Sequence, residues 1–225
     1  PEEQAAGEHY QKGLNHLAQG EYELAVAEFE AVFQLDPDYG DVALRLGEAR
    51  QQLEAEPTAT PQLQQEVNAL YLERLREAYG ARDWLQVIAL ADQLIGVDAS
   101  YARAEVDQML FDAFVALAEE RVADDSMAEA VRYYERALIL QPGNAQVARA
   151  KDLATLYVGG AAYWGADWER ASEQFSVLYA LAPDYKDVRQ RTLDAHLSYA
   201  ELLSDAEDWC AARDQYTYAM EISSS

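Results

Sequence analysis

Apolar and small residues recur along the chain at spacings of three and four, which place side chains on one face of an α-helix. The pattern occurs five times. Each copy has a polar residue, then an aromatic, leucine-like or methionine position, and then a small position three residues further on. The polar residues are Glu21, Asp83, Ser126, Asp167 and Asp208. A carboxylate or hydroxyl there favours the free N–H groups of a helix start, so the pattern predicts five helices that begin at these residues.

The agreement continues along each of these helices. Four residues after the small position stand Phe29, Ala91, Tyr134, Phe175 and Tyr216, and the last apolar positions are Leu35, Val97, Leu140, Leu181 and Ile222. Pro37, Pro142 and Pro183 follow two residues later, where a proline ring stops a helix. The large apolar positions 22, 84, 127, 168 and 209 are separated by 62, 43, 41 and 41 residues. The chain is therefore an internal repeat.

A further helix is predicted before each of these five, at roughly 3–18, 62–79, 100–122, 144–163 and 185–206. An extra helix is expected near 39–53, followed by a loop from Glu54 to Pro61 that contains Pro57. This insertion explains the long first separation. We predict an all-α chain of five helix pairs in one solenoid domain. The pairs are 1–38, 62–99, 100–143, 144–184 and 185–225, and residues 39–61 form the insertion.

The repeat resembles the tetratricopeptide repeat (TPR) family. Pair one carries the resemblance best, in Gly13, Gln19-Gly20-Glu21-Tyr22, Ala25, Phe29 and Leu35-Asp36-Pro37. Pair four matches in Gly159, Trp168, Ala171, Phe175, Leu181 and Pro183, and pair three in Ala130, Tyr134, Ala137, Leu140 and Pro142. Pair two departs, with Val87 and Ala91. The later repeats are longer than the family's repeat of about 34 residues, so their first helices are expected to be lengthened. The resemblance implies a right-handed α-solenoid.

In that family the first helix of each pair lines a concave groove that binds peptide or protein. Transferring the groove positions to this chain gives Tyr10, Arg76, Tyr79, Tyr163 and Trp164 as contact residues, with Gly160 on the same surface. Aromatic anchors lose little side-chain entropy on binding. The alternative is that the lengthened helices turn these residues into the packing between repeats.

The net charge restricts the partners. The chain has 41 acidic and 17 basic residues, a formal charge of −24. Such a surface repels phosphate backbones and anionic headgroups, which argues against nucleic acid and membrane-surface partners. A neutral or basic protein or peptide is favoured. The lysine and asparagine clamp with which some TPR proteins hold a carboxylate is not found, because Leu14, Arg76 and Tyr10 occupy its positions.

The sequence gives no catalytic, cofactor or metal motif. There is no nucleophile elbow, phosphate loop or metal-ligand spacing, and adjacent acids such as Asp124-Asp125 are common at helix ends. His9, His16 and His196 fall where the family places packing residues. Cys210 is the only cysteine, so no intrachain disulfide forms, and it is expected to be an inert thiol. A non-enzymatic role is favoured.

The fifth pair is not followed by a capping helix. Tyr216, Tyr218 and Met220 are therefore expected to be exposed and to offer a self-association surface. Three hypotheses remain: a scaffold that binds protein through its groove, an oligomerisation element (a homodimer included), and a regulatory domain of a larger enzyme. The single cysteine favours the cytoplasm or another reducing compartment. A start at Pro1 leaves room for an upstream signal or anchor.

Overall fold

The computed structural model describes residues 2–55 and 61–224, which fold into helices joined by turns. The first helices of the pairs are α1 (Glu2–Gln19), α4 (Pro61–Ala81), α6 (Arg103–Ala123), α8 (Ala145–Tyr163) and α10 (Val188–Asp205). The second helices are α2 (Tyr22–Leu35), α5 (Trp84–Val97), α7 (Met127–Leu140), α9 (Trp168–Leu181) and α11 (Trp209–Ser224). The extra helix is α3 (Val42–Ala55). An all-α helical-repeat fold is thereby confirmed.

The second helices begin where the repeat predicts. They start at Tyr22, Trp84, Met127, Trp168 and Trp209, and four of the five are 14 residues long. The helices that precede Pro37, Pro142 and Pro183 each end two residues before the proline. The first helices are longer, at 18 to 21 residues, as expected from the long repeat.

Three of the five predicted caps form. The side chains of Asp83, Asp167 and Asp208 accept a hydrogen bond from the backbone N–H three residues on, which satisfies a free donor of the helix start. Glu21 and Ser126 make no such bond. The carboxylate of Glu21 instead contacts His16, with an Oε2–Nδ1 distance of 2.6 Å.

Several predicted boundaries were wrong by two or three residues. The helices expected from 39, 100 and 185 begin at Val42, Arg103 and Val188, because short turns fill the difference. In one such turn Asp98 accepts a hydrogen bond from the Ser100 N–H at 2.9 Å. The loop expected from Glu54 to Pro61 is shorter at both ends, since α3 runs to Ala55 and α4 starts at Pro61. Residues 56–60, with Pro57, lie outside the described part.

Each turn within a pair contains a residue with positive φ. These residues are Gly20, Arg82, Asp125, Gly165 and Glu207, with φ between 59° and 78°. This left-handed conformation lets the chain reverse after the first helix, and it favours glycine. Only two of the five turns have glycine there, so the other three contain a side chain in a conformation that costs roughly 1–2 kcal/mol.

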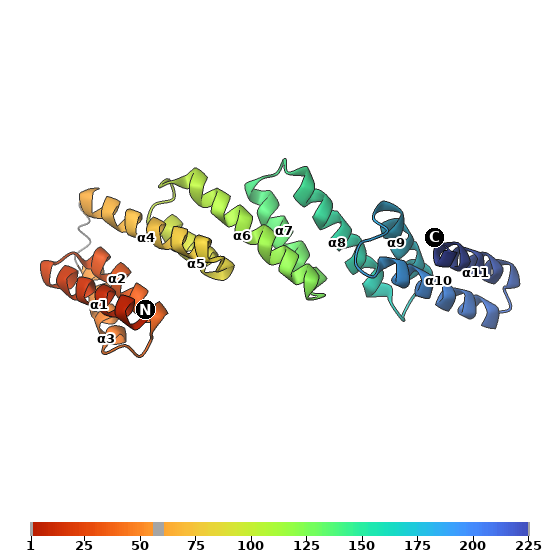
Figure 1. The fold of residues 1–225 in the computed structure, drawn as a ribbon, viewed down its shortest axis with the longest axis horizontal. Coiled ribbons are helices and arrows are strands. Elements are labelled where there is room, and N and C mark those ends of the chain that lie inside the picture. Colours follow the sequence, from red (N-terminus) through yellow and green to blue (C-terminus); the bar gives the residue numbers. More distant parts are fainter. Residues whose placement is uncertain (1, 56–60, 225) are drawn as a thin grey trace. The chain divides into compact units, whose positions relative to one another are not determined.

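The structure divides into two compact units, residues 1–110 and 111–225, with the boundary inside α6. In the first unit α1, α2 and α3 lie together, as the red and orange helices of Figure 1 show. Their core contains Ala25, Phe29 and Val32 of α2, with Val42 and Leu46 of α3. The extra helix thus covers the exposed side of the first pair, in the way that a following repeat would.

Helix α4 packs against α2 through polar as well as apolar groups. Arg74 is buried, donates a hydrogen bond to the carbonyl oxygen of Ala27 at 3.4 Å and contacts Gln34. Burial lowers the pKa of its guanidinium, while Tyr71, Glu30 and Glu28 oppose that shift. The charge of Arg74 is therefore held among compensating groups.

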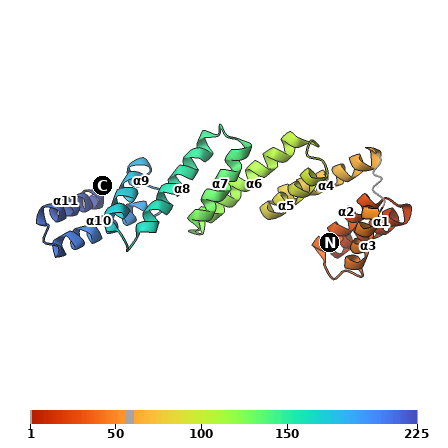
Figure 2. The same ribbon diagram turned by 180° about the vertical axis from the view of Figure 1, so that it is seen from behind.

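In the second unit α7 to α11 pack in sequence order, as Figure 2 shows for the green and blue helices. Phe175 and Leu178 of α9 are fully buried, and so are Val188 and Ala195 of α10. Tyr157 of α8 donates a hydrogen bond to Asp187 at 2.8 Å, just before α10 begins. This bond and the buried face of α9 fix the position of α10.

Two glycines allow close contact inside a helix pair. A Cβ atom on Gly13 would lie 2.7 Å from the ring of Phe29, and one on Gly160 would lie 2.7 Å from the ring of Phe175. Gly160 is therefore buried in the pair, and its expected place on the groove surface was wrong. Gly159, matched to the family from the sequence, is only half-buried and would meet the side chain of Gln174.

The close contact of Gly13 can be tested against another helical glycine of the same unit. A Cβ atom on Gly47 of α3 meets nothing within 4 Å. We expect Gly13→Ala to destabilise the first unit by about 1–3 kcal/mol, because the methyl group overpacks the Phe29 contact. Gly47→Ala should stabilise the same unit by about 0.5–1 kcal/mol, since alanine favours a helix. Urea unfolding followed by circular dichroism measures both, and equal effects would contradict the contact.

Tyr185 gives the second unit a dependence on alkaline pH. Burial and the nearby Tyr134 and Tyr157 raise the pKa of its hydroxyl to about 12, and the hydroxyl has no hydrogen-bond partner among the described residues. The folded state thus favours the neutral phenol. Its contribution is complete below about pH 10 and is lost as the pH rises through about 12.

Tyr185→Phe should therefore be as stable as the parent at pH 7 and more stable near pH 11.5. After allowance for solvent screening, we expect a difference on the order of 1 kcal/mol. Urea midpoints at pH 7, 10 and 11.5 measure it, with Tyr216→Phe on the exposed side of α11 as the control. A constant difference across this pH range would show that Tyr185 ionises as readily in the folded state as in the unfolded state.

Candidate functional site

The five groove residues predicted from the resemblance fall in two different units. Tyr10, Arg76 and Tyr79 belong to the first unit, and Tyr163 and Trp164 belong to the second. Each has intramolecular contacts, so their role in binding a partner stays a prediction.

In the first unit these contacts are polar and aromatic. Tyr10 donates a hydrogen bond to Asp41, and this bond raises the pKa of the hydroxyl. Its ring lies 5.9 Å from that of Phe29, centroid to centroid. The guanidinium of Arg76 donates two hydrogen bonds to the carboxylate of Glu105, at 2.6 and 2.8 Å. Tyr79 packs edge to face on Trp84. These side chains join helices of the same unit.

In the second unit Tyr163 and Trp164 lie at the turn after α8. The guanidinium of Arg170 lies 5.4 Å from the ring centre of Tyr163, and that of Arg191 lies 4.7 Å from that of Trp164. Trp164 also packs edge to face on Trp168. Both rings remain half-exposed. Each ring is thus partly accessible, and an arginine already lies over it in a cation–π contact.

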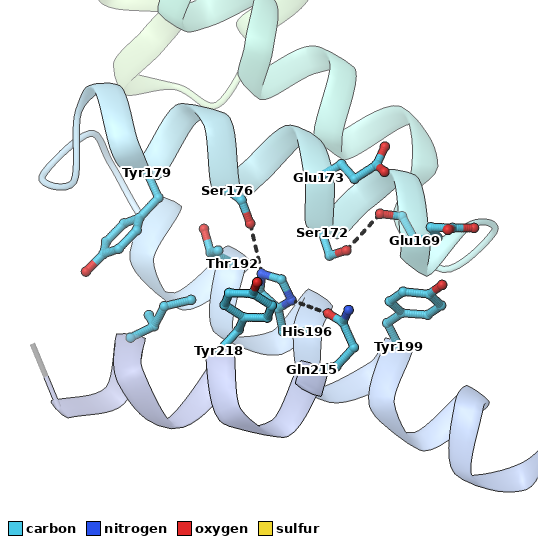
Figure 3. Close-up of a pocket in the computed structure, with 11 residues that line it drawn as sticks. Glu169, Ser172, Glu173, Ser176, Tyr179, Thr192, His196, Tyr199, Gln215 and Tyr218 are labelled. Atoms are coloured by element: carbon cyan, nitrogen blue, oxygen red, sulfur yellow. Dashed lines mark hydrogen bonds between the residues drawn. The ribbon is translucent and has the colours of Figure 1, made fainter. Parts of the chain in front are cut away.

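The clearest hollow in the second unit lies between α9, α10 and α11 (Figure 3). Its volume is about 500 Å³. Each helix contributes side chains at helical spacing: Glu169, Ser172, Glu173, Ser176 and Tyr179 from α9, Thr192, His196 and Tyr199 from α10, and Gln215, Tyr218 and Ile222 from α11. We call this hollow the tyrosine pocket. Since α9 and α11 are second helices, most of its lining residues lie outside the predicted first-helix groove.

A chain of hydrogen bonds crosses the tyrosine pocket. The buried ring of His196 contacts Ser176 Oγ through Nε2 at 2.8 Å and Gln215 Oε1 through Nδ1 at 2.7 Å (Figure 3). Because an amide oxygen only accepts, Nδ1 carries the proton, and in the neutral ring Nε2 accepts from the serine hydroxyl. Tyr218 stacks on the imidazole, with ring centres 5.6 Å apart. These bonds connect α9, α10 and α11.

The same connection occurs between equivalent positions of the first unit. Ser176 and Glu30 both lie eight residues after the start of their second helix, and His196 and Tyr71 both lie thirteen residues before the start of theirs. Tyr71 donates a hydrogen bond to Glu30 at 2.8 Å. The link between Ser176 and His196 is thus a repeated way of fixing one pair to the next.

The order of hydroxyl, imidazole and amide resembles that of a nucleophile, a base and a group that orients the base. Ser176 lies inside α9, however, where the backbone N–H groups are used by the helix. The serine therefore has no pair of adjacent backbone donors for an oxyanion. We assign the three side chains to the shape of the pocket.

The two ends of the tyrosine pocket differ in polarity. At one end Glu169 lies beside Tyr199 (Figure 3). Burial and the carboxylates of Glu169, Glu173 and Asp167 raise the pKa of the Tyr199 hydroxyl, which marks a negative potential there. Tyr179 lies at the other end (Figure 3), and Tyr218 and Ile222, one helical turn apart on α11, also line the pocket. No lysine or arginine lines the pocket.

A second hollow, in the first unit, has different walls. It measures about 450 Å³ and is lined by residues of α1, α2, α4 and α5. Arg74, Glu77 and Asp83 line it, with no tyrosine. Arg74 is already bonded to α2, so its charge is not free for a ligand. This hollow also lacks the aromatic surface that makes the tyrosine pocket a better binding site.

No group of three or more metal-ligating side chains lies together in the described ranges. None of the helices described has the length and apolar character needed to cross a bilayer. All three histidines are hydrogen-bonded: His9 to Glu28, His16 to Glu21, and His196 as above. Cys210 is exposed.

Comparison with known protein families gives a match for the first helix pair. Residues 9–39 match the model of the tetratricopeptide repeat family. This segment is therefore similar to a tetratricopeptide repeat. The match covers most of α1 and all of α2, which is the pair with the strongest resemblance in sequence. A search of curated proteins gives no match.

Tetratricopeptide repeats are generally non-catalytic and typically bind proteins or peptides. The TPR match and the helical-repeat structure therefore indicate a protein-interaction scaffold.

The tyrosine pocket was not predicted from the sequence. The sequence pattern predicts His196 as a packing residue and Tyr218 as an exposed residue of a self-association surface. It does not predict the other lining residues as part of a binding site. A signal does exist in the sequence. Ser172, Ser176, Thr192, His196 and Gln215 put polar groups at positions where TPR helices pack on one another.

The hydrogen-bond chain makes a prediction for the tautomer of His196. We expect Nδ1 to carry the proton of the neutral ring and Nε2 to be the acceptor, since Gln215 accepts through oxygen. Long-range ¹H–¹⁵N correlation spectra report this state directly. Gln215→Leu removes the acceptor and should reduce the preference. A proton on Nε2 in the parent would mean that the Gln215 amide is reversed and that Ser176 accepts.

Proposed function

We propose that this protein is a non-catalytic scaffold that binds an extended peptide segment of a partner protein in the tyrosine pocket of its second unit. The observation that carries the proposal is a hollow of about 500 Å³ with three tyrosines and two carboxylates, built from side chains of three successive helices.

The walls of the tyrosine pocket suit a peptide. Tyrosine offers a large apolar surface and a polar end with few rotatable bonds, which favours binding. Ser172, Glu173 and Tyr199 supply polar groups along the pocket, and Figure 3 shows the amide nitrogen of Gln215 on the side of Tyr199. The tyrosine rings can contact the apolar side chains of an extended peptide, and the polar groups can form hydrogen bonds with its backbone.

Selection from a random linear peptide library on the immobilised protein tests the proposal. The affinities of enriched peptides are then measured for the parent and for Tyr199→Ala/Tyr218→Ala. We expect the double variant to lose at least about tenfold in affinity, because two anchoring rings are removed. The matched control is Tyr216→Ala, which removes an exposed tyrosine of α11 outside the pocket.

A second variant, Tyr163→Ala/Trp164→Ala, tests the first-helix groove. Peptides that lose affinity only for this variant would overturn the tyrosine pocket in favour of the groove. Enrichment of no peptide would overturn peptide recognition. Circular dichroism and thermal unfolding confirm that each variant is folded.

We propose self-association through α11 as the alternative function. Trp209, Tyr216 and Met220 are 65%, 38% and 64% exposed, and their spacing of seven and four residues places them on one face of the helix. Tyr218, also expected at this surface, is 54% exposed but lines the tyrosine pocket. Only Arg213, Asp214 and Glu221 are charged on α11, so this face repels a second copy less than the remaining acidic surface.

Sedimentation velocity at rising concentration, with reductant to keep Cys210 free, tests the alternative. Self-association predicts a concentration-dependent dimer that Trp209→Glu/Met220→Glu converts to monomer, because charges are introduced into a buried apolar contact. A monomer at every concentration would rule it out.

A further inference from the structure

We infer that the tyrosine pocket recognises an arginine followed three to four residues later by an apolar side chain, in an extended segment. This inference rests on the proposed function and specifies the partner. The arginine occupies the end formed by Glu169 and Tyr199, and the apolar residue occupies the end formed by Tyr179, Tyr218 and Ile222.

The acidic end selects a cation. Glu169 and Glu173 are one helical turn apart, and Asp167 lies at the start of the same helix. Glu169 lies beside Tyr199 in Figure 3, and burial together with the carboxylates of Glu169, Glu173 and Asp167 raises the pKa of the Tyr199 hydroxyl. Asp167 is paired with Arg170, so a positive group placed there gains mainly from Glu169 and Glu173.

The nearby cations do not neutralise this end. Arg170 is paired with Asp167 at 3.5 Å and lies over Tyr163. Arg189 donates hydrogen bonds to the carbonyl oxygens of Ile222 and Ser223, at the opposite end of the pocket. Glu169 and Glu173 are exposed and have no ion pair within the described residues. Their charge is therefore available to a ligand.

Arginine fits better than lysine. Its planar guanidinium donates to a carboxylate through two parallel N–H groups and stacks on an aromatic ring, whereas an ammonium group does neither. The second unit already shows such stacking, with Arg191 over Trp164 and Arg136 over Phe114 at 4.7 and 4.5 Å. Glu169 and Tyr199 offer the same pair of surfaces to an arginine from outside.

The length of the pocket sets the spacing. Along α9 the apolar end at Tyr179 is six residues beyond Glu173 and ten beyond Glu169, which corresponds to about 9–15 Å at the rise of an α-helix. An extended chain covers this distance in about three to four residues. A single side chain cannot occupy both ends.

The probe is the peptide acetyl-Gly-Arg-Ser-Ser-Leu-Gly-amide, titrated into the ¹⁵N-labelled protein. Matched peptides replace arginine by citrulline, arginine by lysine, or leucine by serine. We expect saturable shifts at α9, α10 and α11 with the parent peptide. Citrulline should weaken binding at least about tenfold and the other two changes about threefold or more, with further weakening at higher salt.

Two protein variants with the same change in charge complete the test. Glu169→Gln/Glu173→Gln should weaken the arginine peptide at least about tenfold and leave the citrulline peptide unchanged. Glu201→Gln/Glu207→Gln, which removes two exposed carboxylates outside the pocket, should have less than a threefold effect.

The outcomes separate this inference from the proposed function. Equal binding of the arginine and citrulline peptides overturns the inference, and so do shifts confined to other helices. If library peptides without arginine bind at α9–α11 and the probe does not, the cation preference is wrong and the peptide site stands. If no peptide binds there, both are overturned.

Discussion

The structure depends on the burial of one apolar face of each second helix, because a single helix pair has nothing else to cover that face. Phe29 and Phe175 are fully buried at the same position of two second helices. In the paired first helix a glycine lets the ring approach the backbone. The outer side of the second helix is then covered by the next helix along the chain. In the first pair this is α3, and in the fourth it is α10.

The same constraint explains why so much of the fold could be predicted from the sequence. The start of every second helix is set by local features: a polar residue, a large apolar residue, and a small residue that meets the neighbouring helix. In three of the five helices the polar side chain caps a free N–H group. Tyr22, Trp84, Met127, Trp168 and Trp209 all open their helices. The first helices were placed less well, because their starts depend on turns such as Asp98–Ala102, where a side-chain bond and a positive φ decide the path.

The candidate site was harder to predict for a physical reason. Its residues come from α9, α10 and α11, and each helix by itself shows only a few polar side chains on a packing face. Serine, threonine and glutamine also occur at such positions for another reason, which is to form hydrogen bonds with backbone groups. Thr192, for example, donates hydrogen bonds to the carbonyl oxygens of Phe175 and Val188. Only the three-dimensional arrangement shows that Ser176, His196 and Gln215 are joined and that tyrosines surround them.

The order of packing has a consequence for how the chain folds. Most contacts join a helix to its immediate neighbour, and α2 with α4 is the principal exception among the described helices. Contacts between residues close in sequence require little loop closure, and such topologies fold rapidly. Within each unit, helices that are neighbours in sequence can therefore pack together early in folding. The contact of α4 with α2 closes a longer loop across α3, so we expect it to form after the contacts between neighbouring helices.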